Sequence, residues 1–97
     1  MNKNTIRTNR ELKKAFQEQI RYCDDYKISI QMLYIEEQLE LTVFLDIDDE
    51  ESADYECVMV EENNEPSNEM IKKAKAEYKY FKQHFENVEL NLEVINV

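Results

Sequence analysis

Apolar and polar residues alternate most regularly between Leu39 and Ile47. Every second residue there is apolar, and most of the residues between are polar or acidic. A period of two predicts a β-strand that buries one face. Weaker alternation over residues 28–34, 55–60 and 88–94 predicts three more strands. The expected buried positions of the clearest strand are Leu39, Leu41, Val43, Leu45 and Ile47.

Two other segments carry apolar residues at helical spacing. Thr8 and Glu11 have the spacing of a capping box and predict a helix over about residues 9–24. A second helix is predicted after Pro66 and up to about residue 86, with Asn64 or Ser67 as its N-cap. The apolar positions are Leu12, Ala15, Phe16, Ile20 and Cys23 in the first helix, and Met70, Ile71, Ala74, Tyr78, Phe81 and Phe85 in the second.

These elements follow the order αβββαβ. We expect one α+β domain over residues 1–97, with residues 1–7 as a flexible N-terminal tail. The connections over residues 35–38 and 48–54 are short enough for an antiparallel meander. The chain has no glycine, so its turns must use Asn, Asp, Glu or Ser, and glycine hairpins cannot form. We therefore expect an antiparallel sheet with both helices packed on one face.

The opposite face of that sheet has a predictable composition. If the apolar residues of the clearest strand face the helices, Glu40, Phe44 and Asp46 face away. The same phase in the third strand turns Glu56, Val58 and Val60 outward. Phe44, Val58 and Val60 then form an apolar centre inside a rim of carboxylates, which is common in binding surfaces. The alternative is an ordinary solvated face with scattered apolar residues.

Charge is sorted along the chain. The 44 residues from Ile28 to Ile71 contain 14 acidic residues and no Lys or Arg. The remaining 53 residues hold all 12 basic residues and only 8 acidic ones, and the net charge is −10. Such a field repels nucleic acid and anionic membranes and attracts basic protein surfaces. The alternative is a solubilising surface, although such surfaces usually mix both signs.

Residues suited to catalysis or cofactor binding are sparse. His84 is the sole histidine, and without glycine there is no phosphate-binding loop or nucleophile elbow. The stretch from Asp46 resembles a calcium-binding loop, but Glu51 and Cys57 stand where that loop needs Gly and Glu. We therefore expect no enzymatic activity, no cofactor and no metal site.

Cys23 and Cys57 are the only cysteines and lack a metal-binding or redox spacing. We expect them to be reduced, with a disulfide as the alternative. The sequence has no signal peptide or membrane span, and its bias toward Asn, Lys, Glu, Ile and Tyr is typical of a low-GC bacterium or its phage. We expect a cytoplasmic location in a bacterial host cell.

Two features stand out as a pair: the segment without Lys or Arg from Ile28 to Glu65, and the acidic loop from Asp46 to Glu51. With the length and element order, they make the chain resemble small acidic inhibitors encoded by phages and mobile elements, including anti-CRISPR proteins and other DNA mimics. The resemblance implies a bacterial nuclease or DNA-binding protein as target, blocked at its nucleic-acid site. The C-terminal strand departs from this group.

Lys72, Lys73 and Lys75 in the second helix, within an αβββα order, are similar to the lysine cluster of double-stranded RNA-binding domains. In that family the cluster contacts phosphates. The Gly-Pro and His of the family's first hairpin loop have no counterpart over residues 35–38, and the acidic block would lie beside the RNA. We expect no direct contact with nucleic acid.

The leading hypothesis from the sequence is a non-enzymatic inhibitor that occupies the nucleic-acid site of a basic nuclease or DNA-binding protein. One alternative is an immunity protein or antitoxin that neutralises a basic toxin. Another is an accessory phage protein that forms a homodimer through the exposed sheet face. We expect no membrane contact. The residues expected to bind the partner are Glu36, Glu37, Glu40, Asp46, Asp48, Asp49, Glu50, Glu51, Asp54, Glu56, Phe44, Val58 and Val60.

Overall fold

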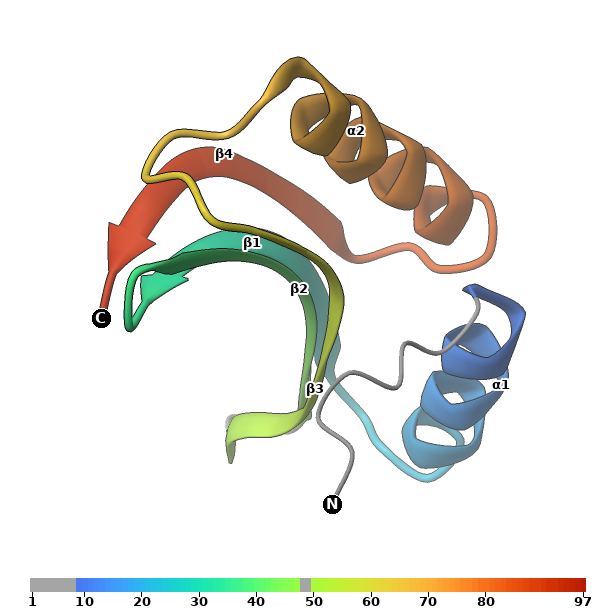
Figure 1. The fold of residues 1–97 in the computed structure, drawn as a ribbon. Helices are drawn as coiled ribbons and strands as arrows, with labels where there is room; N and C mark the ends of the chain where they lie inside the picture. The colour runs from blue at the N-terminus through green and yellow to red at the C-terminus, as the bar shows by residue number, and fades with distance from the viewer. Residues whose placement is uncertain (1–8, 48–49) are drawn as a thin grey trace.

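Six elements follow one another in the predicted order αβββαβ (Figure 1). The computed structural model describes residues 9–47 and 50–97, and for residues 50–55 it describes the backbone alone. The expected N-terminal tail and the Thr8 cap lie outside these residues. The elements are α1 (Asn9–Ile20), β1 (Tyr26–Ile35), β2 (Gln38–Ile47), β3 (Glu50–Glu61), α2 (Asn68–Lys82) and β4 (Val88–Asn96).

The strands form one sheet in the order β3-β2-β1-β4. β1, β2 and β3 make the predicted antiparallel meander, whereas β4 runs parallel to β1. The sheet is therefore mixed, and the expectation of a wholly antiparallel sheet is wrong for the last strand. The reason is the connection through α2, because a helical crossover returns the chain to the end of the sheet where β1 and β3 begin. β3 and β4 are the two edges.

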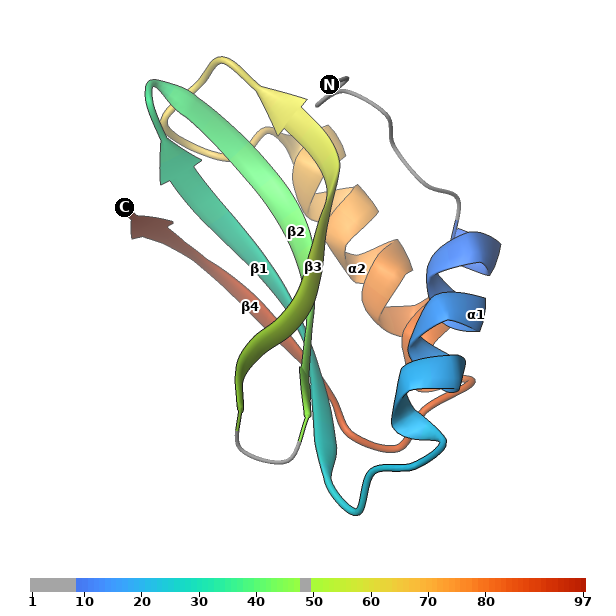
Figure 2. The same ribbon diagram turned by 90° about the horizontal axis from the view of Figure 1, so that it is seen from below.

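Both helices pack on the convex face of the curved sheet, which confirms that one face carries both (Figure 1 and Figure 2). The rings of Phe16 in α1 and Phe81 in α2 meet at a centroid distance of 5.9 Å. Each of these large side chains contributes about 1.5–3 kcal/mol when fully buried. The fully buried residues beneath them include four of the five predicted for β2, namely Leu39, Leu41, Val43 and Leu45, while Ile47 is half-buried.

The start of α2 is tied to the end of β3. Ser67 is the N-cap, and its Oγ accepts a hydrogen bond from the Met70 N–H at 3.1 Å. The Ser67 hydroxyl donates to the Glu61 carboxylate, and the Ser67 N–H donates to Glu61 Oε1 at 3.2 Å. Of the two predicted caps, Asn64 and Ser67, the structure uses Ser67. α1 and α2 end at Ile20 and Lys82, one turn before their predicted ends.

Phe81→Ala should lower the free energy of unfolding by about 3–5 kcal/mol, because it removes a buried ring and leaves a cavity. Its ring centroid lies between 5.4 and 6.1 Å from those of Phe16, Tyr80 and Phe85. Urea unfolding followed by circular dichroism measures the loss. Tyr22, which is 86% exposed, provides the control, and Tyr22→Ala should change stability by less than about 0.5 kcal/mol. Similar losses in both variants would contradict this packing.

Candidate functional site

The charges are divided between the two layers of the fold. The described Lys and Arg residues lie on α1 and α2 or directly beside them, apart from Lys27 at the start of β1. The acidic residues of the segment from Ile28 to Ile71 lie on the strands and their connections, apart from Glu69 in the first turn of α2. The helix layer is therefore basic, and the β2–β3 side of the sheet is acidic.

Four glutamates lie at the end of the sheet where β1 turns into β2, and we call them the turn-end cluster. Glu36 and Glu37 form the turn, Glu40 lies near the start of β2, and Glu62 follows the end of β3. Glu36, Glu37 and Glu62 are exposed, and Glu40 is half-buried. None of the four forms an ion pair with a basic residue of the described chain. Their charges are therefore available to a partner.

The turn that carries Glu36 and Glu37 has an unusual backbone. The two residues have φ angles of 47° and 66°, in the left-handed region, between the paired residues Ile35 and Gln38. Two-residue hairpins of this kind strongly prefer Asn-Gly, because a Cβ in this region costs about 1–2 kcal/mol per residue. A tight hairpin thus forms without glycine, and it holds two adjacent carboxylates in solvent.

The concave face of the sheet is left open by the described elements (Figure 1). The strand register aligns Ile95, Leu33, Glu40 and Val60 in one row across all four strands. Leu33 and Glu40 are half-buried, while Val60 and Ile95 are 42% and 39% exposed. This row places apolar side chains on both sides of a carboxylate that belongs to the turn-end cluster.

Two polar residues in the middle of this face are buried. Ser29 is 4% exposed and Thr42 is fully buried, although the described helices lie on the other side. Thr42 Oγ1 donates to the Gln31 carbonyl at 3.1 Å, which satisfies its hydroxyl. Phe44, opposite Ser29 in the register, is half-buried and remains part of the face as predicted.

A β-bulge in β3 changes part of the predicted face. Leu41 pairs with Met59, but Thr42 pairs with Cys57, so Val58 is an extra residue on the β3 side. The bulge shifts the phase of the strand by one residue. The sequence carries no glycine or proline at this point that would have signalled it.

Because of the bulge, two predicted binding residues do not lie on the outward face where the sequence analysis placed them. Glu56 stands opposite Val43, whose side chain is buried under the helices, so Glu56 does not belong to the outward row. Val58 is 5% exposed and belongs to the core, so it is no surface anchor. Val60 keeps its predicted outward position opposite Glu40.

The remaining predicted acids belong to the other end of β2. Asp46 is half-buried opposite Lys27, and five strand residues lie between it and Glu40, a rise of about 20 Å. The acidic block is therefore divided into two groups at opposite ends of the meander. Asp48 and Asp49 lie outside the described residues, and for three others the structure gives the β3 backbone alone: Glu50, Glu51 and Asp54.

Glu77 is a buried carboxylate that the sequence reasoning missed. Its side chain is 1% exposed, and Lys73 Nζ lies 3.2 Å from its Oε1. Apart from this ion pair, neither oxygen has a hydrogen-bond partner. Burial raises the pKa of Glu77, and Lys73 offsets part of that effect. The helical spacing of Met70, Ala74 and Phe81 includes position 77 and was the signal that could have identified it.

Cys23 and Cys57 are both half-buried, and no disulfide joins them. Cys23 Sγ donates to the Gln19 carbonyl at 3.1 Å. Burial raises the pKa of Cys57, and the nearby Glu40 and Glu56 act in the same direction. A thiol of raised pKa is a poor nucleophile at neutral pH.

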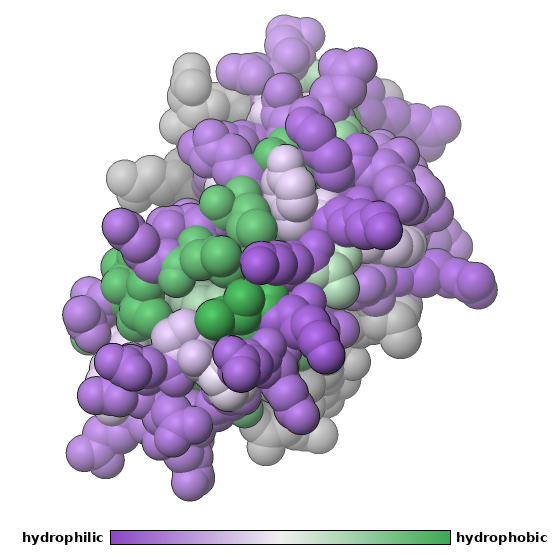
Figure 3. Space-filling view, turned by 90° about the horizontal axis from the view of Figure 1, so that it is seen from above, coloured by the Kyte–Doolittle hydropathy of each residue, from purple (hydrophilic) through white to green (hydrophobic). Residues whose placement is uncertain are grey.

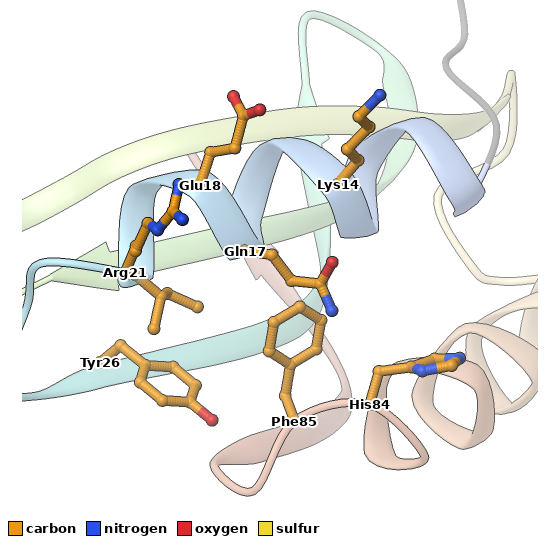
Figure 4. Close-up of a pocket in the computed structure, with 8 residues that line it drawn as sticks. Lys14, Gln17, Glu18, Arg21, Tyr26, His84 and Phe85 are labelled. Carbon is orange, nitrogen blue, oxygen red and sulfur yellow. The ribbon is translucent and has the colours of Figure 1, made fainter.

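An open hollow of about 440 Å³ lies between α1, the start of β1 and the end of α2 (Figure 4). Figure 4 shows Gln17, Tyr26 and Phe85 around it, while the ends of Lys14 and Glu18 point away. His84 is exposed, and its ring lies 4.9 Å from that of Tyr80, without a hydrogen bond to a described side chain. The hollow is on the basic side, away from the predicted binding residues, and lacks a nucleophile–base pair.

Residues 9–47 and 50–97 lack the features of a metal site or a membrane-spanning helix. No group of three or more His, Cys, Asp or Glu residues in these ranges could hold a metal ion. No helix in them has the length and apolar character needed to cross a membrane. Comparison of the chain with protein-family models, with curated proteins and with solved structures finds no match.

Glu77→Gln should stabilise the protein at neutral pH and leave stability unchanged at acidic pH. Because the folded pKa of Glu77 is raised above its usual value of 4.5, the folded state holds this proton to higher pH than the unfolded chain. The wild type therefore loses stability as pH rises from about 4.5 through the folded pKa, and the variant does not. Urea unfolding across this range measures the difference. Glu18→Gln controls for the loss of one charge, and an equal, pH-independent effect in both variants would contradict the assignment.

Glu36→Asn combined with Glu37→Gly should raise the free energy of unfolding by about 1–2 kcal/mol, because Asn and Gly tolerate the left-handed backbone. Glu36→Gln with Glu37→Gln is the matched control, since it removes both charges but keeps both β-carbons. Thermal unfolding of the two variants separates backbone strain from charge repulsion. If both gain equally, repulsion and not strain is the cost of this turn.

Proposed function

We propose that this protein inhibits a basic nucleic-acid-binding protein, such as a nuclease, by occupying its nucleic-acid site. The observation that supports this most directly is the separation of charge between the two layers. The carboxylates of the turn-end cluster project from the β1–β2 end of the sheet without basic partners in the described chain. Arg and Lys side chains that normally bind phosphates can accept such an array as a substitute.

The spacing of the acidic groups suits an extended cationic cleft. The turn-end cluster and the group around Asp46 lie at opposite ends of β2, a strand of ten residues and about 30 Å. A duplex presents phosphates over a similar length. A protein that binds along the meander would therefore meet anionic groups at both ends of its cleft.

The open concave face can add apolar contact between these groups. Val60 and Ile95 are exposed in the same row as Glu40, and Phe44 is half-buried further along the face. An apolar centre with charged surroundings gains affinity from burial and specificity from charge. Long-range attraction between the acidic layer and a basic target would make association fast and sensitive to salt.

Glu36→Lys with Glu37→Lys should weaken target binding by about tenfold or more, because two attractive contacts become repulsive. The wild-type chain is immobilised, a bacterial lysate is applied, and bound proteins are eluted with a salt gradient. Each captured nucleic-acid-binding protein is then purified and loaded with fluorescent duplex DNA. The wild-type chain should displace the DNA, and the variant should require a much higher concentration.

Glu18→Lys with Glu86→Lys is the matched control, since it changes the net charge equally at exposed acids outside the acidic block. It should displace DNA as the wild type does. Asp48→Lys with Asp49→Lys tests the other acidic group in the same assay. A complex in which target, DNA and inhibitor remain bound together would contradict occupation of the nucleic-acid site, and equal weakening by variant and control would contradict a defined contact.

A further inference from the structure

The outer side of β4 is an open strand edge. The Ile28 N–H donates to the Asn87 carbonyl at 2.8 Å, and the Val97 N–H donates to the Tyr34 carbonyl at 3.1 Å. Residues 87 and 97 therefore direct their backbone groups toward β1. Because backbone direction alternates along a regular strand, residues 88, 90, 94 and 96, on either side of the middle of β4, direct theirs away from β1. Since β4 is last in the strand order, no strand of the described residues lies beside these groups.

A bulge in the middle of β4 preserves this alternation. One residue separates Ile30 from Met32 in β1, while three separate their partners Leu90 and Val94 in β4. An insertion of two residues keeps the phase of the strand on both sides. The Glu93 N–H, which the bulge separates from β1, donates to Asn91 Oδ1 at 3.0 Å. The inward groups are thus satisfied by β1, or within β4 for the Glu93 N–H, and the groups on the other side of β4 have no strand of the described residues beside them.

The surface along β4 exposes several apolar side chains. Leu92, Ile95 and Val97 are 37%, 39% and 79% exposed. Figure 3 shows a continuous group of apolar side chains on this side of the molecule, surrounded by polar ones. Edge strands are normally protected by charged residues, especially lysine, by proline or by bulges. β4 has one bulge and two glutamates but no Lys, Arg or Pro. An open edge of this composition favours pairing with another strand.

We propose that two copies of this chain pair antiparallel through β4, with the two-fold axis at Leu92, to form one continuous eight-stranded sheet. In this register every outward backbone group faces an outward group of the second copy, and Leu92 faces its own counterpart. Leu90 lies opposite Val94 of the second copy, and Glu89 lies opposite Ile95. The strand is therefore self-complementary, as an isologous contact requires.

Charge disfavours the two adjacent registers and the other edge of the sheet. Moving the axis to residue 91 would place Glu89 opposite Glu93, and moving it to residue 93 would place Glu93 opposite itself. At the other edge, β3 contains five acidic residues, so two copies paired there would bring like charges together. Pairing through β4 keeps the acidic β3 edges apart, because three strand spacings of about 4.8 Å separate β3 from β4 in each copy.

Sedimentation equilibrium of the full chain tests the proposal. The wild type should have twice the monomer mass of 11.7 kDa, and raised salt should preserve the dimer, because apolar contacts and backbone hydrogen bonds hold it. Leu92→Lys places two ammonium groups on the two-fold axis and should give a folded monomer. Val60→Lys, at a similarly exposed apolar residue on the opposite edge strand, should remain dimeric.

Cross-linking tests the register without relying on disruption. In a chain carrying Cys23→Ser and Cys57→Ser, Leu92→Cys should form a disulfide-linked dimer on mild oxidation, whereas Val60→Cys should not. A wild type that stays monomeric up to millimolar concentration would overturn the proposal. So would a dimer that survives Leu92→Lys or fails to cross-link at position 92. These readouts need no target protein, so they are independent of the proposed inhibitory function.

Discussion

Burial of the convex face of the sheet under both helices is the constraint on which the rest of this structure depends. The fully buried row in β2 and the aromatic contact between α1 and α2 are two sides of one core. The helices that supply the cover carry nearly all described basic residues, and most acids of the segment from Ile28 to Ile71 lie on the strands and their connections. The separation of charge is thus a consequence of which elements form which layer.

The fold retains two local features that cost stability. Glu36 and Glu37 occupy left-handed backbone positions, and Glu77 is buried with a single ion-pair partner. Neither feature stabilises the core. Other residues would be more stable at these positions, namely Asn and Gly in the turn and Gln in place of Glu77. At the turn, the unfavourable residues are also those that present adjacent carboxylates to solvent. A function that needs anionic side chains there explains why glutamate stands where Asn and Gly would be more stable.

The fold could be predicted from the sequence largely because β2 alternates so regularly. Its five apolar positions predicted the buried face, and the helical stripes with Phe16 and Phe81 predicted the cover. The bulge in β3 could not be predicted, because an extra residue such as Val58 changes the phase without a glycine or proline to mark it. As a result, the predicted outward orientation was wrong for Glu56 and Val58 and correct for Glu40 and Val60.

The direction of β4 was missed for a different reason. Alternation predicts that a segment is a strand but says nothing about its neighbour, and a two-residue bulge at Leu92 further obscures the pairing with β1. The buried carboxylate of Glu77 was missed because acidic residues are so frequent in this chain that one more at a core position gave little signal. Both errors concern contacts between distant segments, which local patterns do not encode.

The two edges of the sheet are open in the strand order, but their chemistry is opposite. β3 carries five acids, so its edge repels a second copy and is protected from strand addition by charge alone. β4 carries two acids and exposes Leu92 and Ile95, so that protection is absent at the other edge. The same sorting of charge therefore has two effects. It keeps a second copy away from the acidic β3 edge, and under the proposed pairing it lets two copies meet at β4 without bringing their acidic surfaces together.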